Sequence, residues 1–240
     1  MDERARLGRP SYVWRSGQTR RWQIIARWGC LERVNRVLDA GTGVGLYLRA
    51  FVEAGVPLAV GTEYEFARAA RAAGHRGCRA VQAAEQLPFP DATFDLVLSH
   101  EVLEHVGDDR RAARELVRVL CPGGRAVIFV PNRLWPFETH GVFWRGRYHF
   151  GNVPLVNYLP NRWRNRLAPH VRAYTAGEVR RLFEGLPVRI VHHGQIFPGY
   201  DNLSATHPRL GRFVRAVTYG LERTPLQIVG LSHVLVVERM

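Results

Sequence analysis

The stretch that decides the fold is VLDAGTGVG, residues 37–45, in which an apolar run leads directly into three closely spaced glycines. The run has the length of a buried strand, and glycines at 41, 43 and 45 let the backbone turn sharply and approach a ligand closely. A helix is expected over residues 46–54, and its N-terminal amides and positive dipole end would face that ligand. The segment therefore predicts a strand, a ligand-binding turn and a helix.

An acidic residue, Glu63, lies at the end of the next expected strand. It follows the glycines by about twenty residues, where an acid hydrogen-bonds the hydroxyls of an adenosine ribose. The glycines read GxGxG followed by Leu46, whereas dinucleotide-binding proteins read GxGxxG because a third glycine packs beside the pyrophosphate. This spacing favours an adenosine cofactor other than NAD, without excluding NAD.

The sequence around this segment alternates short apolar runs with helical patterns, which is typical of a parallel sheet with crossover helices. Strands are expected at 37–40, 58–62, 79–82, 94–99 and 125–130, and helices at 46–54, 65–73 and 109–120. Gly123 and Gly124 are expected to separate the last of these helices from the strand that follows.

After Pro131 the pattern changes. Residues 131–173 and 194–229 show no clean period and are expected to be irregular. Between and after them we expect a helix at 176–186, with a capping box formed by Thr175 and Glu178, and strands at 188–193 and 234–237.

The six tryptophans all lie outside the alternating core, at positions 14, 22, 28, 135, 144 and 163. They are expected either to pack together as an extra hydrophobic layer or to form a lid over an apolar or aromatic substrate. The two interpretations are compatible, and the sequence favours the lid because long irregular stretches in compact domains are often lids or binding loops.

Composition narrows the functional classes. The 240-residue chain carries a net charge of +13, and arginine supplies all of its 34 basic side chains because the chain has no lysine. This charge suggests nucleic acid, an acidic substrate, an anionic membrane surface or simply a basic solvated surface. Three scattered cysteines, an N-terminus without a signal peptide and apolar runs too short to span a membrane predict a cytoplasmic protein without disulfides.

The motifs occur in a recognisable order. VLDAGTGVG, GTE, AEQLPFPDATFDLVLS, EVLEHV and LCPGGRAVIFVPN follow one another between residues 36 and 132. Together they resemble the successive motifs of class I S-adenosylmethionine-dependent methyltransferases, and most closely the group that includes the ubiquinone-biosynthesis O-methyltransferases. The resemblance implies an α/β, Rossmann-like, mostly parallel sheet of seven strands with helices on both faces and an inserted substrate cap. We expect a helical cap segment over 1–35, and a methyltransferase domain over 36–240 with cap insertions at about 131–173 and 194–229.

The resemblance also implies a set of contacts with S-adenosylmethionine. Asp39 and Gly41 would bind its methionine end, Glu63 its ribose, and Ala84 and Glu85 would lie beside the adenine, with Phe89 lining that part of the pocket. The full set of cofactor-binding residues is expected to be Asp39, Gly41, Thr42, Gly43, Gly45, Glu63, Tyr64, Ala84, Glu85, Ser99 and His100. Ala83 stands where related sequences carry an acid that receives the adenine amino group, which predicts weaker cofactor binding.

The densest polar cluster, SHEVLEHV at residues 99–106, follows the fourth strand. Its ExxEH pattern places Glu101, Glu104 and His105 close together, where they could bind a divalent cation or orient His105 as a base. The pattern resembles the metal-binding ExxEH of small-RNA 2′-O-methyltransferases. We expect His105, Glu101 and His100 to be the catalytic residues; alternatively, His105 only caps or packs.

A metal would need a further ligand, for which His140 and His149 are candidates. His192 and His193 are expected to pack in the sheet. Arg133, Arg145 and Arg147 could meet phosphates or carboxylates of a substrate.

Three functions fit these expectations. The first is O-methylation of a hydrophobic or aromatic small molecule such as a quinone precursor, a lipid or a natural product. The second is metal-dependent 2′-O-methylation of RNA, and the third is a catalytically silent cofactor-binding protein. Expected partners are therefore a small-molecule acceptor, less readily a nucleic acid, and a membrane surface that is contacted peripherally.

Overall fold

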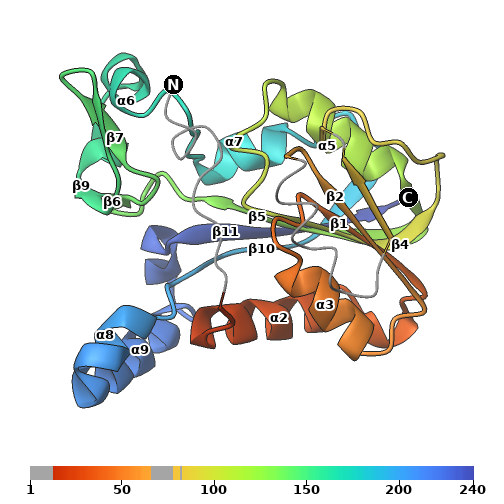
Figure 1. Ribbon diagram of the computed structural model, residues 1–240, viewed down its shortest axis with the longest axis horizontal. Coiled ribbons are helices and arrows are strands. Elements are labelled where there is room, and N and C mark those ends of the chain that lie inside the picture. Colours follow the sequence, from red (N-terminus) through yellow and green to blue (C-terminus); the bar gives the residue numbers. More distant parts are fainter. Residues whose placement is uncertain (1–12, 66–77, 82) are drawn as a thin grey trace.

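A computed structural model describes residues 13–65, 78–81 and 83–240 and shows one seven-stranded sheet between two layers of helices (Figure 1). The strand order is β10-β11-β5-β4-β1-β2-β3. The bounds are Arg36–Ala40 (β1), Leu58–Glu63 (β2), Cys78–Val81 (β3), Phe94–His100 (β4), Leu120–Pro131 (β5), Val188–Ile196 (β10) and Ser232–Arg239 (β11). Strands β1 to β5 are parallel, and β11 runs antiparallel between β5 and β10. The predicted seven-stranded, mostly parallel α/β fold is confirmed.

Helices cover both faces of the sheet, as Figure 1 shows. Helices α5 (Asp109–Arg118) and α7 (Ala176–Arg181) bury Leu116, Val117 and Val179 against one face. Helices α2 (Ser16–Trp28) and α3 (Leu46–Glu53) cover the other face. Two separate hydrophobic cores result, and the central strands are buried on both sides because each faces both cores.

Helix α2 belongs to the core. Its Ile25 is fully buried, and Trp22 meets the ring of Phe51 in α3 edge-on, with 5.1 Å between centroids. Trp28 stacks on His192 of β10 at 4.1 Å. The expectation that the N-terminal tryptophans form a lid is therefore wrong for Trp22 and Trp28, while the expected sheet packing of His192 is confirmed.

The stretch 131–173 is not irregular. It forms two small antiparallel pairs, β6 (Phe137–Glu138) with β9 (Val153–Pro154) and β7 (Val142–Trp144) with β8 (Arg147–His149). A 3₁₀ turn (Val156–Tyr158) and helix α6 (Asn161–Leu167) follow. Strands of two or three residues are too short to produce a visible period, so the sequence pattern could not reveal them.

The stretch 194–229 is mostly helical, contrary to expectation. Helices α8 (Asp201–Thr206) and α9 (Pro208–Leu221) form a hairpin, and a 3₁₀ turn (Pro225–Val229) leads into β11. The amphipathic pattern of α9 was hidden because its exposed side also carries large apolar residues.

Smaller differences concern element ends. Gly123 and Gly124 lie inside β5, where a register shift against β4 accommodates them, so they do not precede the strand. Helix α7 ends at Arg181, five residues before the predicted end, although its capping box of Thr175 and Glu178 is present. The helix expected at 65–73 falls almost entirely outside the described residues. In the part of the chain that is described, no helix is both long and apolar enough to cross a membrane.

Candidate functional site

A cavity of about 820 Å³ opens at the carboxyl ends of β1, β2 and β4. This is the edge of a parallel sheet where ligands bind in α/β proteins. Asp39, Gly43 and Glu63 line one side of the cavity, and His100, Glu101 and His105 line the other. One space therefore joins the two groups of residues that the sequence singled out.

The three glycines of the turn after β1 each adopt a left-handed conformation, with φ between +58° and +83°. Gly41 also has no room for a side chain, because a Cβ would lie 2.4 Å from Cγ2 of Val102. A Cβ on Gly43 would meet nothing within 4 Å, so this part of the turn faces open space. Gly45 caps helix α3 and does not line the cavity.

Asp39 is buried at the end of β1 and accepts a 2.6 Å hydrogen bond from the hydroxyl of Thr42. Burial raises the pKa of Asp39 to about 7, and the charge of Glu63 contributes to the increase. A buried carboxylate of this kind is stabilised when a cation binds next to it. Asp39 therefore fits the positively charged end of a sulfonium amino acid.

Glu63 is held by backbone amides at the end of β2. Its Oε2 accepts from the amide of Gly43 at 2.8 Å and its Oε1 from the amide of Glu65 at 3.1 Å. Each carboxylate oxygen has a second lone pair, so Glu63 retains capacity for ribose hydroxyls. Tyr64, the next residue, also lines the cavity.

The region expected to receive the adenine is formed by Ala83, Ala84 and Glu85, which all line the cavity. The Glu85 carboxylate accepts from the amide of Gly107 at 2.8 Å and so links two loops of the wall. Phe89 does not line the cavity, contrary to expectation; its ring packs on Phe94 in the core at 5.0 Å.

Ser99 and His100 end β4, but only His100 reaches the cavity. Ser99 is 1% exposed and does not line the cavity, so the expected contact of Ser99 with the cofactor stays a prediction. His100 packs between the rings of Tyr47 and Phe129, and its Nε2 is buried without a hydrogen-bond partner. Burial and the nearby Arg21 lower the pKa of His100 to about 4, so the imidazole is neutral at pH 7.

The ExxEH residues lie in a turn rather than in a helix, because α5 begins only at Asp109. Glu101 has a φ of +56° and accepts a 2.9 Å hydrogen bond from Ser232 at the start of β11. Burial opposes the ionisation of Glu101, but His100 and Arg21 prevail and lower its pKa. Burial and the charge of Glu101 raise the pKa of Glu104 well above its usual range.

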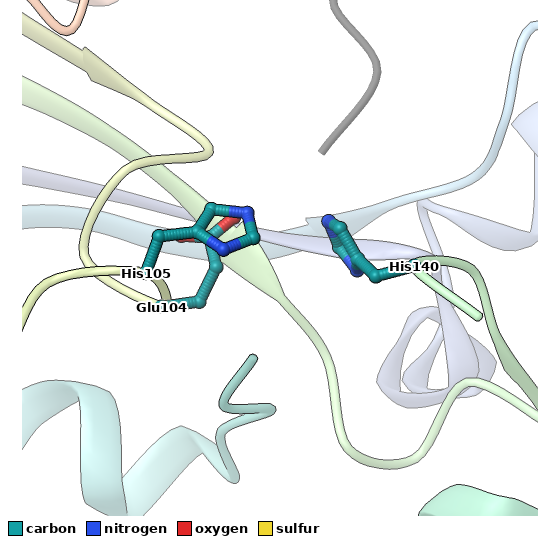
Figure 2. Close-up of side chains that lie close together, drawn as sticks. All are labelled: Glu104, His105 and His140. Atoms are coloured by element: carbon teal, nitrogen blue, oxygen red, sulfur yellow. The ribbon is translucent and has the colours of Figure 1, made fainter. Parts of the chain in front are cut away.

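Glu104, His105 and His140 form a cluster whose potential ligand atoms all lie within 4.8 Å of one another. Figure 2 shows the rings of His105 and His140 next to each other and nearly perpendicular, with Glu104 beside His105. Both carboxylate oxygens of Glu104 are buried, and a hydrogen bond shared with the adjacent Glu101 contributes to its raised pKa. Two imidazoles and a buried carboxyl group, which would give up its proton on binding, are a donor set that suits a divalent transition metal.

The cluster does not include all of the residues that the sequence predicted for a metal site. Glu101 is not part of it, since its carboxylate is turned to Ser232. Of the two further candidates, His140 joins the cluster, whereas His149 is exposed in β8. Nδ1 of His105 lies 3.3 Å from the carbonyl of His170, and Nδ1 of His140 lies 3.3 Å from Glu138. Nε2 of each ring is therefore the atom left for a metal or a proton.

A buried ion pair between Arg164 and Glu138 holds the segment that carries His140. Arg164 of α6 donates to Glu138 at 2.7 Å, and both side chains are almost fully buried. Arg164 also donates to the carbonyl of Val171 and to the side chain of Asn157. The insertion thus presents His140 to the cavity from a rigid base.

Sequence reasoning missed several lining residues. Gln18 and Arg21 reach the cavity from α2, Arg111 from α5 and Ser232 from β11. No local motif marks them, because only the packing of distant segments brings them to this edge of the sheet. None of the tryptophans lines the cavity, and Trp144 is 57% exposed in β7, so the expected tryptophan lid over the cavity is not present in the described residues.

Comparison with known proteins agrees with this geometry. The sequence pattern of a methyltransferase domain matches residues 38–128. An uncharacterized methyltransferase of Mycobacterium marinum is 36% identical over 190 residues, which cover 75% of this chain and 69% of the relative. One from Mycobacterium sp. (strain JLS) is 42% identical over 108 residues, which cover 43% of this chain and 42% of the relative, so this chain spans less than half of that protein.

Solved structures share the fold over nearly the whole chain. An S-adenosylmethionine-dependent methyltransferase from Mesorhizobium loti aligns with a TM-score of 0.62 and 18% identity, covering 94% of this chain and 98% of the other. The [4+2]-cyclase SpnF aligns with a TM-score of 0.60 and 20% identity, and the alignment covers 97% of this chain and 84% of the cyclase. The sheet order, the glycine turn, the acid at the end of β2 and the Mycobacterium marinum relative lead to one conclusion: the chain belongs to the class I S-adenosylmethionine-dependent methyltransferase family.

Proposed function

We propose that this protein transfers the methyl group of S-adenosylmethionine to an oxygen atom of a hydrophobic or aromatic small molecule, such as a quinone precursor, a lipid or a natural product. The observation that carries the proposal is the shared cavity: Asp39 and Glu63 line one side, and neutral imidazoles line the other. A methyl donor and a hydroxyl acceptor could then meet between them.

The cofactor side provides binding and orientation. Asp39 would pair with the positive charges of the methionine end, and Glu63 would accept hydrogen bonds from the ribose hydroxyls. S-adenosylmethionine supplies an electrophilic methyl carbon on a sulfonium. Because the sulfonium is already reactive, placing the acceptor oxygen about 3–3.5 Å from that carbon in line with the C–S bond provides much of the rate acceleration.

The acceptor side provides proton removal. As the acceptor oxygen bonds to the methyl carbon, the C–S bond breaks, its electron pair stays on sulfur and the hydroxyl proton must leave. Burial and the nearby His140 lower the pKa of His105 to about 4, so its ring is unprotonated at pH 7 and Nε2 would be the atom that takes the proton. Glu101 and His100 line the same wall and would keep the acceptor in place.

A divalent metal is an alternative use of the same cluster. Glu104, His105 and His140 would hold it, and their potential ligand atoms lie close enough together for one ion. A bound metal would lower the pKa of the acceptor hydroxyl. In that case His105 would be a ligand and would not act as the base.

The insertion at 131–173 fits the role of a substrate cap, because it contributes Thr139 and His140 to the cavity wall. Gln18 and Arg21 do the same for the N-terminal segment. The cap would consist of these polar residues and would not depend on the tryptophans that the sequence suggested.

The first test is binding. S-adenosylhomocysteine should bind in isothermal titration, and NAD much more weakly. The second test is turnover: radiolabelled S-adenosylmethionine is supplied with a panel of catechols, hydroxylated quinone precursors and hydroxylated lipids, and label should enter an oxygen of at least one class. His105→Gln should then lose on the order of 10²–10⁴-fold in rate if His105 is the base.

Other results would redirect the proposal. Salt-dependent binding of single-stranded RNA, with methylation of its 2′ oxygen, would replace the small-molecule acceptor. Tight binding of S-adenosylhomocysteine without methyl transfer to any acceptor class would favour a catalytically silent protein.

A further inference from the structure

Helices α8 and α9 form a hairpin that projects from the body of the protein next to the N-terminal end of α2 (Figure 1). Its position is fixed by polar contacts. Asp201 accepts hydrogen bonds from the amides of Ser16 and Gly17, and Glu222, just after α9, pairs with Arg20 of α2. The hairpin is therefore a projection anchored to the core.

The outward side of α9 carries an apolar stripe. Leu210, Phe213 and Val217 are 50%, 66% and 46% exposed, and their spacing places them on one face of the helix. Leu226, Ile228 and Val229 of the following 3₁₀ turn are also exposed. Isolated exposed apolar residues are ordinary, but a continuous patch marks an interaction surface.

The charge around this stripe has one sign. Arg209 and Arg212 in α9 and Arg223 just after it are exposed, and Arg209 lies one helical turn before Phe213. Glu222 is the only acidic residue between positions 202 and 237, and it is occupied by Arg20. Arg215 points inward and donates to the carbonyl of Gly199. The outward surface of the hairpin is consequently apolar and cationic, with no acidic group of its own.

We propose that the α8–α9 hairpin binds the surface of an anionic phospholipid bilayer. An interfacial helix inserts an apolar face below the headgroups while basic residues at its border attract anionic lipids. Leu210, Phe213 and Val217 provide such a face, and Arg209 and Arg212 provide the basic border. Phe213, the most exposed of the three apolar residues, would insert most deeply.

The charges disfavour a second copy of the chain as the occupant. A twofold interface brings the same patch of two subunits together. Arginines would then face arginines around the apolar stripe, with no acidic residue of the hairpin available to compensate. Anionic lipid headgroups provide the missing negative charge.

Membrane binding goes beyond methyl transfer and does not depend on it. It would nevertheless bring the cavity close to the bilayer, because α2, to which the hairpin is anchored, contributes Gln18 and Arg21 to the cavity wall.

The test is vesicle co-sedimentation of the full chain, without cofactor or acceptor. Vesicles of phosphatidylcholine alone are compared with vesicles of phosphatidylcholine mixed with the anionic lipid phosphatidylglycerol. We expect at least tenfold tighter binding to the anionic vesicles, weakening as salt is raised. Phe213→Ser and the pair Arg209→Gln/Arg212→Gln should each lose about tenfold or more.

Matched controls are available on other surfaces. Leu58, 42% exposed at the start of β2, gives Leu58→Ser, and the exposed Arg33 and Arg114 give Arg33→Gln/Arg114→Gln. Both control variants should bind vesicles like the wild type. Absence of vesicle binding by the wild type would overturn the proposal, as would equal binding by Phe213→Ser. A dimer in sedimentation velocity that Phe213→Ser abolishes, without vesicle binding, would assign the patch to self-association and overturn it too.

Discussion

The backbone amide of Gly43 donates a 2.8 Å hydrogen bond to Oε2 of Glu63, so the glycine turn after β1 and the acid that ends β2 fix each other. The two residues are twenty positions apart in the sequence, and they follow or end the adjacent parallel strands β1 and β2. Each depends on the other, because the turn orients the carboxylate and the carboxylate holds the amide that would otherwise lack a protein partner. This relationship makes the cofactor site the firmest basis for prediction.

Replacing Glu63 by alanine should weaken S-adenosylhomocysteine binding by about 1.5–3 kcal/mol, the cost of losing hydrogen bonds to a charged group. Isothermal titration measures the change. Glu53→Ala on the exposed side of α3 is a matched control and should bind like the wild type. If Glu63→Ala also binds like the wild type, the ribose assignment is wrong.

Cofactor affinity should rise with pH across neutrality. Burial raises the pKa of Asp39 to about 7, so much of this carboxyl is protonated below pH 7 and must ionise when a cationic ligand binds. Affinity for S-adenosylmethionine should therefore fall as the pH is lowered below 7, by at most about tenfold per pH unit for one proton.

The apo protein should respond in the opposite sense. Because the folded-state pKa of Asp39 lies above its unfolded value, ionisation costs stability as pH rises from about 4 to about 7. Asp39→Asn should remove this cost, so its melting temperature should exceed that of the wild type at pH 8. It should also flatten the pH dependence of cofactor binding; an unchanged profile would rule out Asp39 as its source.

Metal binding by the cluster can be measured without turnover. Mn²⁺ should bind with a stoichiometry near one in isothermal titration, and His140→Ala should weaken that binding at least tenfold because a ligand is lost. His149→Ala removes an exposed histidine outside the cluster and is the control. Equal binding by both variants, or full activity after exhaustive chelation, would leave His105 as a base or as a packing residue.

Removing one partner of the buried Arg164–Glu138 pair should be costly. Arg164→Met leaves the Glu138 carboxylate buried without its cation and should destabilise the fold by about 3–5 kcal/mol, measured by denaturant unfolding. The double variant Glu138→Leu/Arg164→Met should recover part of the loss. Comparable stability of Arg164→Met and the wild type would mean that the pair does not hold the insertion.

Two tryptophans should behave differently on truncation. Trp22 packs against Phe51 in the core, so Trp22→Ala should cost about 2–4 kcal/mol of stability. Trp144 is largely exposed, and Trp144→Ala should change stability by less than about 0.5 kcal/mol. Thermal unfolding of both variants measures these changes in stability. A destabilised Trp144→Ala variant would show that Trp144 packs in the protein.

The sequence by itself determined the central architecture. Residues 36–132 carry strongly patterned strands, a glycine turn that only glycine can form, and an acid at a fixed distance from it. These are local signals: a buried parallel strand needs an apolar run, and the turn after it needs the left-handed backbone that glycine adopts at 41, 43 and 45. Glu63 could be named in advance from its position at the end of the second strand, and the resemblance to the methyltransferase family pointed to Asp39 and Gly43.

Only the tertiary structure decided the other half of the site. His140 and Ser232 lie 35 and 127 residues beyond His105 in the sequence, yet all three line one cavity. His140 is placed there by strands of two or three residues and by the ion pair between Glu138 and Arg164. Neither feature produces a periodic pattern in the sequence. The roles of the tryptophans likewise depended on packing, because an aromatic ring has the same chemistry in a lid as in a core. What surrounds it is set by contacts between distant segments, and the sequence pattern does not contain these contacts.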